Sequence, residues 1–181
     1  SNDVTASGRL LGAADPPAVE TVNRLGSSRS LLSGDHAGNL VPQALGTLGL
    51  DPRELQRHIA WDIGVAALGR ALAERLDAPF IAQRYSRLVI DCNRPPGSPT
   101  SVAPLSDGTS IPSHEGLSRD DAAPRIRDIF APYHCAIARA PHDSPKSEPP
   151  TIPVSPHIFP PVYPRLPLPG KTEVAGQGAA M

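Results

Sequence analysis

The sequence predicts an α/β domain whose partly parallel sheet is flanked by helices. Segments with the patterns of strand, helix, strand and helix follow one another along residues 1–140. The chain has 181 residues, which suits a single domain. Hydrophobic residues make up 39% of the chain and charged residues 19%, a balance typical of a folded protein rather than of a highly charged disordered one.

The first strand is expected at residues 30–33, a short apolar segment that stops at Gly34. The preceding residues, 1–28, are polar and contain turn-forming proline and glycine, so we expect loops there. The strand would bring Asp35 and His36 to its carboxyl end. Ligands of open α/β sheets bind outside such ends, so this pair is a candidate for function.

A long helix is expected from Asp51 to about Asp77. Asp51 suits the N-cap and Pro52 the first helical position, and apolar residues recur after them at spacings of three and four. On this helix His58 would share a face with Asp62, four residues later. A buried acid needs a partner or a cation, so Asp62 is either half of a structural ion pair or a metal ligand that His58 orients.

Two more strand-like runs are expected at residues 80–82 and 88–91. Asn93 and Arg94 follow the second run and would lie at its carboxyl end. Arginine presents a planar fork that matches a carboxylate, and asparagine can add a hydrogen bond, so this pair suits an anionic small substrate. Two nearby arginines either contribute to the same site or are ordinary surface residues: Arg84 and Arg87.

The last part of the predicted domain is a long loop at residues 97–117 followed by a helix. Ser118, with Asp121 three residues later, has the pattern of a helix N-cap. The helix would run to about Ile137, with an interruption at Pro132.

Six histidines are present, and no two of them have the spacing of the HExxH zinc helix. His36 is the best single candidate for a metal ligand, because it follows a strand, adjoins Asp35 and lies near Gly38, which lets backbone segments approach closely. Zinc needs a neutral imidazole nitrogen and usually further nitrogen or carboxylate ligands. The alternative for His36 is a loop histidine with no ligand role.

Composition excludes several classes of function. A formal charge of −1 argues against a protein that binds nucleic acid by neutralising phosphates. No apolar run approaches the ~18 residues of a membrane span, and no signal-peptide pattern opens the chain. Two cysteines cannot form a disulfide framework, so we expect a cytoplasmic protein. Cys92, beside Asp91, is expected to be a small buried side chain rather than a nucleophile.

Proline is unusually frequent, with 23 residues in the chain and a dense run of them from Pro141 to Pro169. Proline lacks an amide donor and fixes φ, so no helix or interior strand is expected to run through this spacing. We therefore divide the chain into a globular part, 1–140, and an irregular tail, 141–181. The tail is either disordered, the product of a shifted reading frame, or a proline-rich ligand for a partner groove.

Four motifs in the globular part carry a resemblance when they are taken together. GDHAGNLVP, RHIAWDIG, QRYSRLVIDCNRPPG and SDGTSIP, in this order, closely resemble the N-formylglutamate amidohydrolase family. The resemblance covers residues 10–139 and weakens up to Tyr163. It implies a zinc-carboxypeptidase-like mixed sheet flanked by helices, similar to aspartoacylase, with the C-terminal part of that fold missing here.

The resemblance also implies an activity, which is the hydrolysis of N-formylglutamate to formate and glutamate during histidine degradation. The substrate is a small anionic N-acyl amino acid, and Asn93 and Arg94 would hold one of its carboxylates, with help from Arg84 or Arg87. The general-base glutamate is expected in the C-terminal region that this chain lacks, so no catalytic residue is assigned.

Metal ligands follow from the resemblance in the same way, with zinc as the implied cofactor. His36 would be the first ligand. The zinc carboxypeptidase pattern has a glutamate three residues later, where this chain has Asn39, so we prefer Asp62 as the carboxylate ligand and keep Asp35 in reserve. The segment VSPHIFPPVY resembles the strand motif that carries the third ligand, and it puts His157 in that place.

Two rival hypotheses remain open at this stage. The chain is either a non-catalytic degenerate fragment with a partner-binding tail, or a hydrolase of another N-acyl amino acid. Weak zinc affinity and poor folding would favour the first. A preference for an acetyl over a formyl amide would favour the second.

Overall fold

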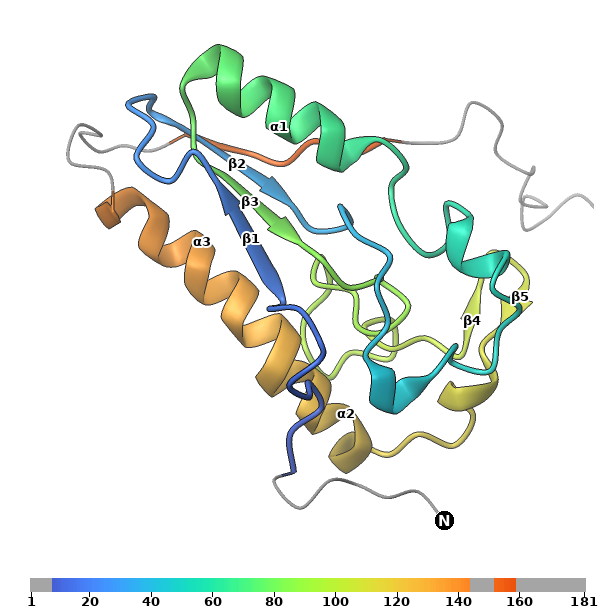
Figure 1. Ribbon diagram of the computed structural model, residues 1–181. Helices are drawn as coiled ribbons and strands as arrows, with labels where there is room; N and C mark the ends of the chain where they lie inside the picture. Colours follow the sequence, from blue (N-terminus) through green and yellow to red (C-terminus); the bar gives the residue numbers. More distant parts are fainter. Residues whose placement is uncertain (1–7, 144–151, 159–181) are drawn as a thin grey trace, which may run out of the picture.

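The computed structural model describes residues 8–143 and 152–158. A four-stranded mixed sheet lies between two helices, α1 on one side and α3 on the other (Figure 1). The strands lie in the order β1, β3, β2, β6, and β2 is parallel to both of its neighbours while β1 is antiparallel to β3. Their bounds are Val19–Val22 for β1, Ser30–Gly34 for β2, Phe80–Gln83 for β3 and Ile152–Val154 for β6. The predicted α/β class with a partly parallel sheet is confirmed.

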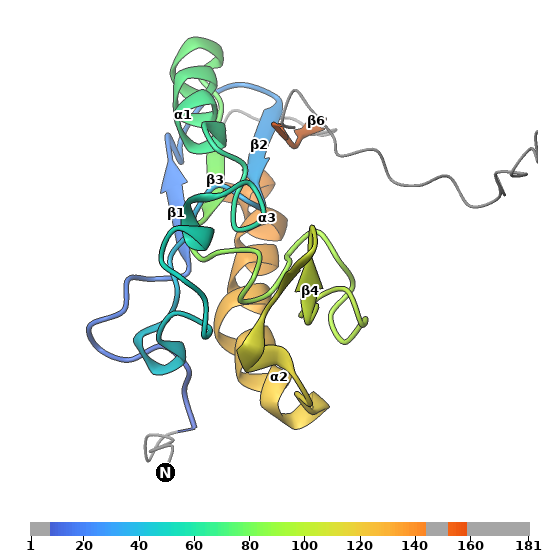
Figure 2. The same ribbon diagram turned by 90° about the vertical axis from the view of Figure 1, so that its right-hand side faces the viewer.

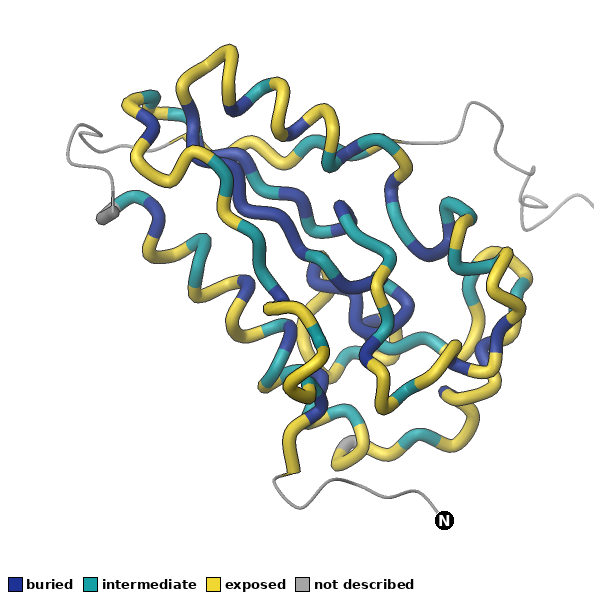
Figure 3. Tube along the Cα trace, in the orientation of Figure 1, coloured by how far each residue is buried: buried dark blue, intermediate teal, exposed yellow. Residues whose placement is uncertain are grey.

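Side chains along the two central strands, β2 and β3, point alternately to the two faces of the sheet and so divide the core into two layers. Leu31 and Ile81 point to the α3 side of the sheet, while Leu32, Phe80 and Ala82 belong to the cluster on the α1 side. Both strands are buried along most of their length, as the dark tube in Figure 3 shows. The central pair therefore provides a rigid platform, and its carboxyl ends carry the site described below.

Strand β6 comes from the proline-rich part of the chain and pairs with the outer side of β2, as Figure 2 shows. Pro153 stands opposite Leu31 in this pairing. A proline is tolerated there because β6 is the edge strand of the described sheet, and an edge strand has one side that makes no ladder bonds. The prediction that proline excludes an interior strand is consistent with this placement. The expectation that no helix enters the proline run from Pro141 is wrong at its start, because helix α3, Ala131–Asp143, continues through Pro141. The rest of the tail assigned to 141–181 lies largely outside the described residues.

The predicted helix from Asp51 to Asp77 is wrong in its first half, since α1 spans only Val65–Leu76. Gly64, immediately before α1, has φ +95°, which interrupts a right-handed helix. Upstream of it the backbone is bonded to other segments: the Asp62 N–H donates to the His36 carbonyl at 2.9 Å, and the Ala60 carbonyl accepts from the Arg87 N–H at 3.1 Å. Tertiary hydrogen bonds have replaced the helical ones.

Two strand assignments also differ from the sequence prediction. Residues 88–91 form a buried turn rather than a strand, and the Val89 N–H donates to the Ser86 carbonyl at 2.9 Å. A short apolar run signals burial but does not by itself distinguish a strand from a buried turn. Strand β1 was missed, because the edge strand Val-Glu-Thr-Val is only half-buried and lies in a segment rich in turn-forming residues.

The loop expected at 97–117 contains a small hairpin of β4, Leu105–Ser106, and β5, Thr109–Ser110. Helix α2, Arg119–Arg125, begins at Ser118 with reciprocal Ser118–Asp121 capping bonds, as predicted. A π-helical turn, Ile126–Phe130, connects α2 to α3, Ala131–Asp143. The regular α-helical hydrogen bonding changes to this π-helical turn immediately before Pro132, so the expected interruption is a local change of helix type rather than a break. Within the described residues, no helix is both long and apolar enough to span a bilayer.

Candidate metal and anion site

Three side chains from distant parts of the chain converge beside the carboxyl ends of β2 and β6. His36 follows β2, His157 follows β6, and Asp62 lies on the irregular segment before α1. One potential ligand atom from each of the three lies within 4.8 Å of the others. Because β2 and β6 are parallel, their carboxyl ends meet at the same edge of the sheet, which is why the two histidines are neighbours.

The Nδ1 atoms of both histidines face the same carboxylate. The Asp62 Oδ2 oxygen lies 3.0 Å from His157 Nδ1 and 3.6 Å from His36 Nδ1. His36 is almost fully buried, and its Nδ1 atom has no hydrogen-bond partner within the part of the chain that the structure describes. A buried polar atom without a partner is costly, so this nitrogen is arranged for a ligand that fits between it and Asp62.

A second carboxylate, Asp91, holds the opposite edge of the His36 ring. Its Oδ1 atom lies 2.7 Å from His36 Nε2. The same carboxylate accepts from the Arg87 guanidinium at 2.9 Å and from the Asn93 N–H at 2.9 Å. These contacts fix the orientation of the His36 ring and direct its Nδ1 atom toward Asp62.

The ionisable side chains of this cluster shift one another's pKa values. Burial alone would raise the pKa of Asp91, but the bond to His36, the Arg87 charge and the Asn93 N–H outweigh it and lower that pKa to about 2. Burial alone would lower the pKa of His36, but the Asp62 and Asp91 carboxylates outweigh it and raise that pKa. In the metal-free protein these residues therefore favour a protonated His36 between two ionised acids.

Asp35 lies on the outer side of His157 rather than inside the cluster. Its Oδ2 atom is 3.7 Å from His157 Nε2 and 3.5 Å from the Ser155 hydroxyl. The buried Tyr133 hydroxyl donates to its Oδ1 atom. Asp62 thus faces both histidines through Nδ1, whereas Asp35 approaches the remaining nitrogen of one.

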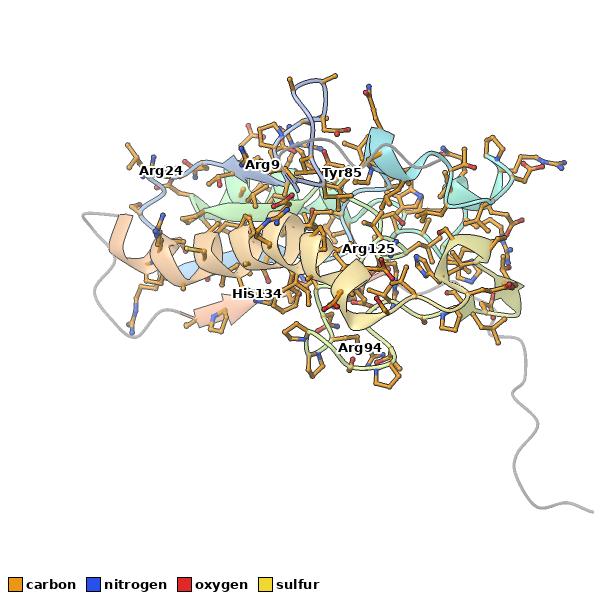
Figure 4. All side chains as sticks on the ribbon, turned by 90° about the horizontal axis from the view of Figure 1, so that it is seen from below. Arg9, Arg24, Tyr85, Arg94, Arg125 and His134 are labelled. Carbon is orange, nitrogen blue, oxygen red and sulfur yellow. The ribbon has the colours of Figure 1, made fainter. Side chains whose placement is uncertain are left out.

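A cleft of about 110 Å³ adjoins this cluster through Asp91. Arg87 and Arg94 line it, and Figure 4 shows Arg94 on an outer loop of the molecule. The remaining lining residues, all from the segment that follows β3, are Leu88, Thr100, Ala103, Ser106 and Ile111. A cleft with two guanidinium groups and an apolar wall suits a small anionic ligand.

The four residues expected to bind substrate are only partly brought together. Arg87 and Arg94 reach the cleft, whereas Asn93 contributes its backbone N–H to Asp91 and does not line the cleft. Arg84 lies by the sheet edge, with its Nε atom 4.0 Å from Glu20 Oε2. Its side chain is therefore engaged away from the cleft.

The sequence model of the N-formylglutamate amidohydrolase family matches residues 28–176. The chain belongs to this family. The matched range begins later than the expected residue 10 and continues past Tyr163, where we had expected the resemblance to end. No curated protein matches the chain.

Two solved structures are similar to this chain. The gene product Atu2144 from Agrobacterium tumefaciens is 35% identical, with a TM-score of 0.81 over 86% of this chain. The N-formylglutamate amidohydrolase from Ralstonia eutropha JMP134 is 21% identical, with a TM-score of 0.56 over 81% of this chain, and shows a shared fold. This chain spans 62% of the first protein and 63% of the second.

His58 is not near Asp62, which corrects the expectation from a shared helix face. Its Nε2 atom lies 3.1 Å from Asp107 in the β4–β5 connection. The reason is the missing helix: an irregular backbone at residues 57–64 turns the two side chains in different directions.

Three further side chains near the site, Cys92, Asp91 and Tyr133, show what could and could not be predicted from the sequence. Cys92 is buried, and burial raises the pKa of its thiol to about 12, so it remains protonated as expected of a packing residue. The sequence analysis missed Asp91 as the partner of His36 and Tyr133 as the partner of Asp35. The argument applied to Asp62, that a buried acid needs a partner, applies equally to Asp91 at the end of its apolar run.

Proposed function

We propose that this member of the N-formylglutamate amidohydrolase family is a zinc-dependent hydrolase that acts on N-formylglutamate. The observation that carries the proposal is the buried Nδ1 atom of His36, which lacks a hydrogen-bond partner among the described residues and faces Asp62 and His157. The adjacent cleft, with Arg87 and Arg94, supports an anionic substrate.

The residues fit a zinc ion. Two imidazole nitrogens and one carboxylate oxygen form a donor set typical of catalytic zinc. His36, Asp62 and His157 would supply it. Asp91 would act on the far side of His36, and such carboxylates fix the ring and increase its basicity. When bound, zinc would polarise the formyl carbonyl and lower the pKa of a water molecule.

The chain's own residues would position the substrate. Arg94 is the cleft guanidinium that forms no ion pair with a carboxylate of the described residues, so its charge is available to a substrate carboxylate. Arg87 is already engaged, at 2.9 Å from Asp91 and 3.7 Å from Asp62. Arg87 would thus set the distance between the metal ligand Asp62 and the cleft, and so orient the amide toward the metal.

No residue of the described part is assigned as general base. The family resemblance implies a glutamate in this role, beyond the motif that carries His157. Loss of general-base catalysis costs about 10²–10⁴-fold in rate, so slow turnover is compatible with the proposal.

Formate release tests the proposal directly. The purified chain is loaded with zinc and incubated with N-formylglutamate, and N-acetylglutamate serves as the competing substrate. Zinc-dependent release of formate that disappears in His36→Ala supports the proposal. Turnover that survives His36→Ala would overturn the metal assignment, and a preference for the acetyl amide would replace the substrate with another N-acyl amino acid.

A further inference from the structure

Behind the cleft lies a buried pair of basic side chains that the proposed chemistry does not use. Arg125, at the C-terminal end of α2, is only 3% exposed, and Figure 4 shows it within the body of the molecule. Its NH1 group donates to the Val89 carbonyl at 3.0 Å and contacts His114 Nε2 at 2.8 Å. His114 is equally buried.

The contacts of His114 determine which of its nitrogens carries the proton. Arginine has only donors, so the bond to Arg125 requires that His114 Nε2 be the acceptor. The other nitrogen, Nδ1, lies 2.8 Å from the Ala103 carbonyl, which can only accept. His114 is therefore a neutral imidazole with its proton on Nδ1. Burial and the neighbouring Arg125 charge lower its pKa, although the Ala103 carbonyl opposes this, so the neutral form is favoured.

These hydrogen bonds join the two walls of the cleft. Val89 lies between Leu88 and Asp91, which line one wall. Ala103 lines the other wall, and the backbone N–H of His114 donates to the carbonyl of Ile111, which also lines the cleft, at 2.9 Å. Arg125 contacts the first wall directly and the second through His114. Arg125 and His114 thus join the two segments that line the cleft, alongside the bond from the Asp91 N–H to the Ser101 carbonyl at 2.8 Å.

The charge of Arg125 has no close counter-ion. In the part of the chain that the structure describes, no carboxylate forms an ion pair with it, and the nearest acid to influence it is Asp121 on the same helix. Burial lowers the pKa of Arg125 to about 10, so it stays charged at neutral pH. A buried charge without a partner is costly unless it serves a ligand, and the neighbouring cleft is built for an anion.

We propose that Arg125 and His114 are positioning residues for the anionic substrate: together they fix the separation of the cleft walls and add positive charge behind them. Acid disrupts this arrangement, because a protonated His114 cannot accept from Arg125 and places a second cation beside it. The identity of the anion as a glutamate derivative rests on the proposed function. Among the described side chains, the charged groups on helix α2 and next to His114 in the sequence are Glu115, Asp120, Asp121 and Arg125, and those that line the adjoining cleft are Arg87, Asp91 and Arg94.

Binding of L-glutamate to the full chain, measured by calorimetry, tests the proposal without relying on turnover. Affinity is compared at about pH 7.5 and about pH 5, because the pKa of His114 lies below the ordinary histidine value of ~6.5. We expect the affinity for L-glutamate to fall between the higher and the lower pH in both proteins. The fall should be about tenfold larger in the unsubstituted chain than in His114→Gln. Glutamine offers an acceptor to Arg125 at both pH values, and the titration of other groups is common to both proteins.

Arg125→Lys and His114→Leu complete the set. Lysine keeps the charge but presents one nitrogen in place of the planar fork, and leucine removes the acceptor, so each should weaken glutamate binding about tenfold at the higher pH. Equal affinities in all variants, the same pH dependence in His114→Gln, or no glutamate binding by the unsubstituted chain would overturn the proposal. Failure of formate release with glutamate binding intact would instead count against the proposed function.

A second readout remains available if an Arg125 variant does not fold. In the unsubstituted chain, nitrogen-15 NMR of the His114 ring should show a neutral imidazole protonated on Nδ1 at neutral pH. An imidazole protonated on Nε2, or on both nitrogens, would contradict the arrangement.

Discussion

Asp91 offers the sharpest test of the coupled charges at the site, and Asp91→Asn is the perturbation. The substitution keeps the shape of the side chain but removes its charge. It removes the nearest ionised partner of His36 and of Arg87, and each keeps only the more distant Asp62 carboxylate, at 3.6 Å and 3.7 Å. Since Asp91 is only 5% exposed, solvent cannot replace what is lost.

The expected magnitude follows from the pKa of Asp91, which is lowered from an ordinary 3.8 to about 2. This difference corresponds to roughly 2 kcal/mol of folding free energy at neutral pH. Because the native-state pKa is the lower one, this stabilisation is present above 3.8 and is lost as the pH falls toward about 2. For a chain of this size, ~2 kcal/mol corresponds to roughly 4–8 °C in Tm.

Urea unfolding of the metal-free chain at neutral pH measures this effect, and repeating it at decreasing pH measures its sign. Asp91→Asn should be about 2 kcal/mol less stable at neutral pH, and the difference should shrink as the solution becomes acidic. Asp107→Asn is the matched control, because its carboxylate pairs with His58 at a partly exposed position and such pairs contribute at most about 1 kcal/mol. Equal losses in the two variants, or a difference that grows in acid, would refute the reasoning.

Three further predictions concern the metal, the cleft and the core. Zinc affinity should rise as the pH rises through the raised pKa of His36, because the metal needs the deprotonated ring. Calorimetry in buffers of different ionisation enthalpy should show that zinc binding releases a proton, and a zinc affinity that does not change with pH would contradict this. Arg94→Ala should weaken glutamate binding about tenfold or more, whereas Arg84→Ala should leave it unchanged. Gly69→Ala should destabilise the fold by about 1–3 kcal/mol in urea unfolding, since a Cβ there would lie 2.2 Å from the Phe80 ring; unchanged stability would show that α1 shifts freely.

Much of the fold followed from local patterns in the sequence. The buried strand that delivers His36, the apolar strand at 80–82 and the capping box at Ser118 were all found where the patterns indicated. Each of these elements is defined by a few consecutive residues and by burial or capping, which sequence periodicity reports well.

The errors arose where long-range contacts override local preference. Residues 51–64 have helical spacing, but the His36 carbonyl and Arg87 N–H take their backbone bonds, and Gly64 breaks the helix. The run 88–91 is apolar because it is a buried turn. No local pattern reports such contacts.

In the candidate site too, local motifs identified individual residues but not the long-range contacts between them. Motifs brought His36, Asp62, Arg94 and His157 to attention one by one, and the structure places three of them around a shared space. The partners that hold them could not be read from spacing. Asp91 binds His36 across 55 residues of sequence, and Tyr133 reaches Asp35 across 98.

X-ray absorption at the zinc edge on the zinc-loaded chain tests the central claim most directly. The account predicts one zinc per chain, with two imidazole nitrogens and a carboxylate oxygen at ~2.0–2.2 Å, and the loss of one imidazole in His157→Ala. A chain that takes up no zinc, or a zinc environment that His157→Ala leaves unchanged, would contradict it.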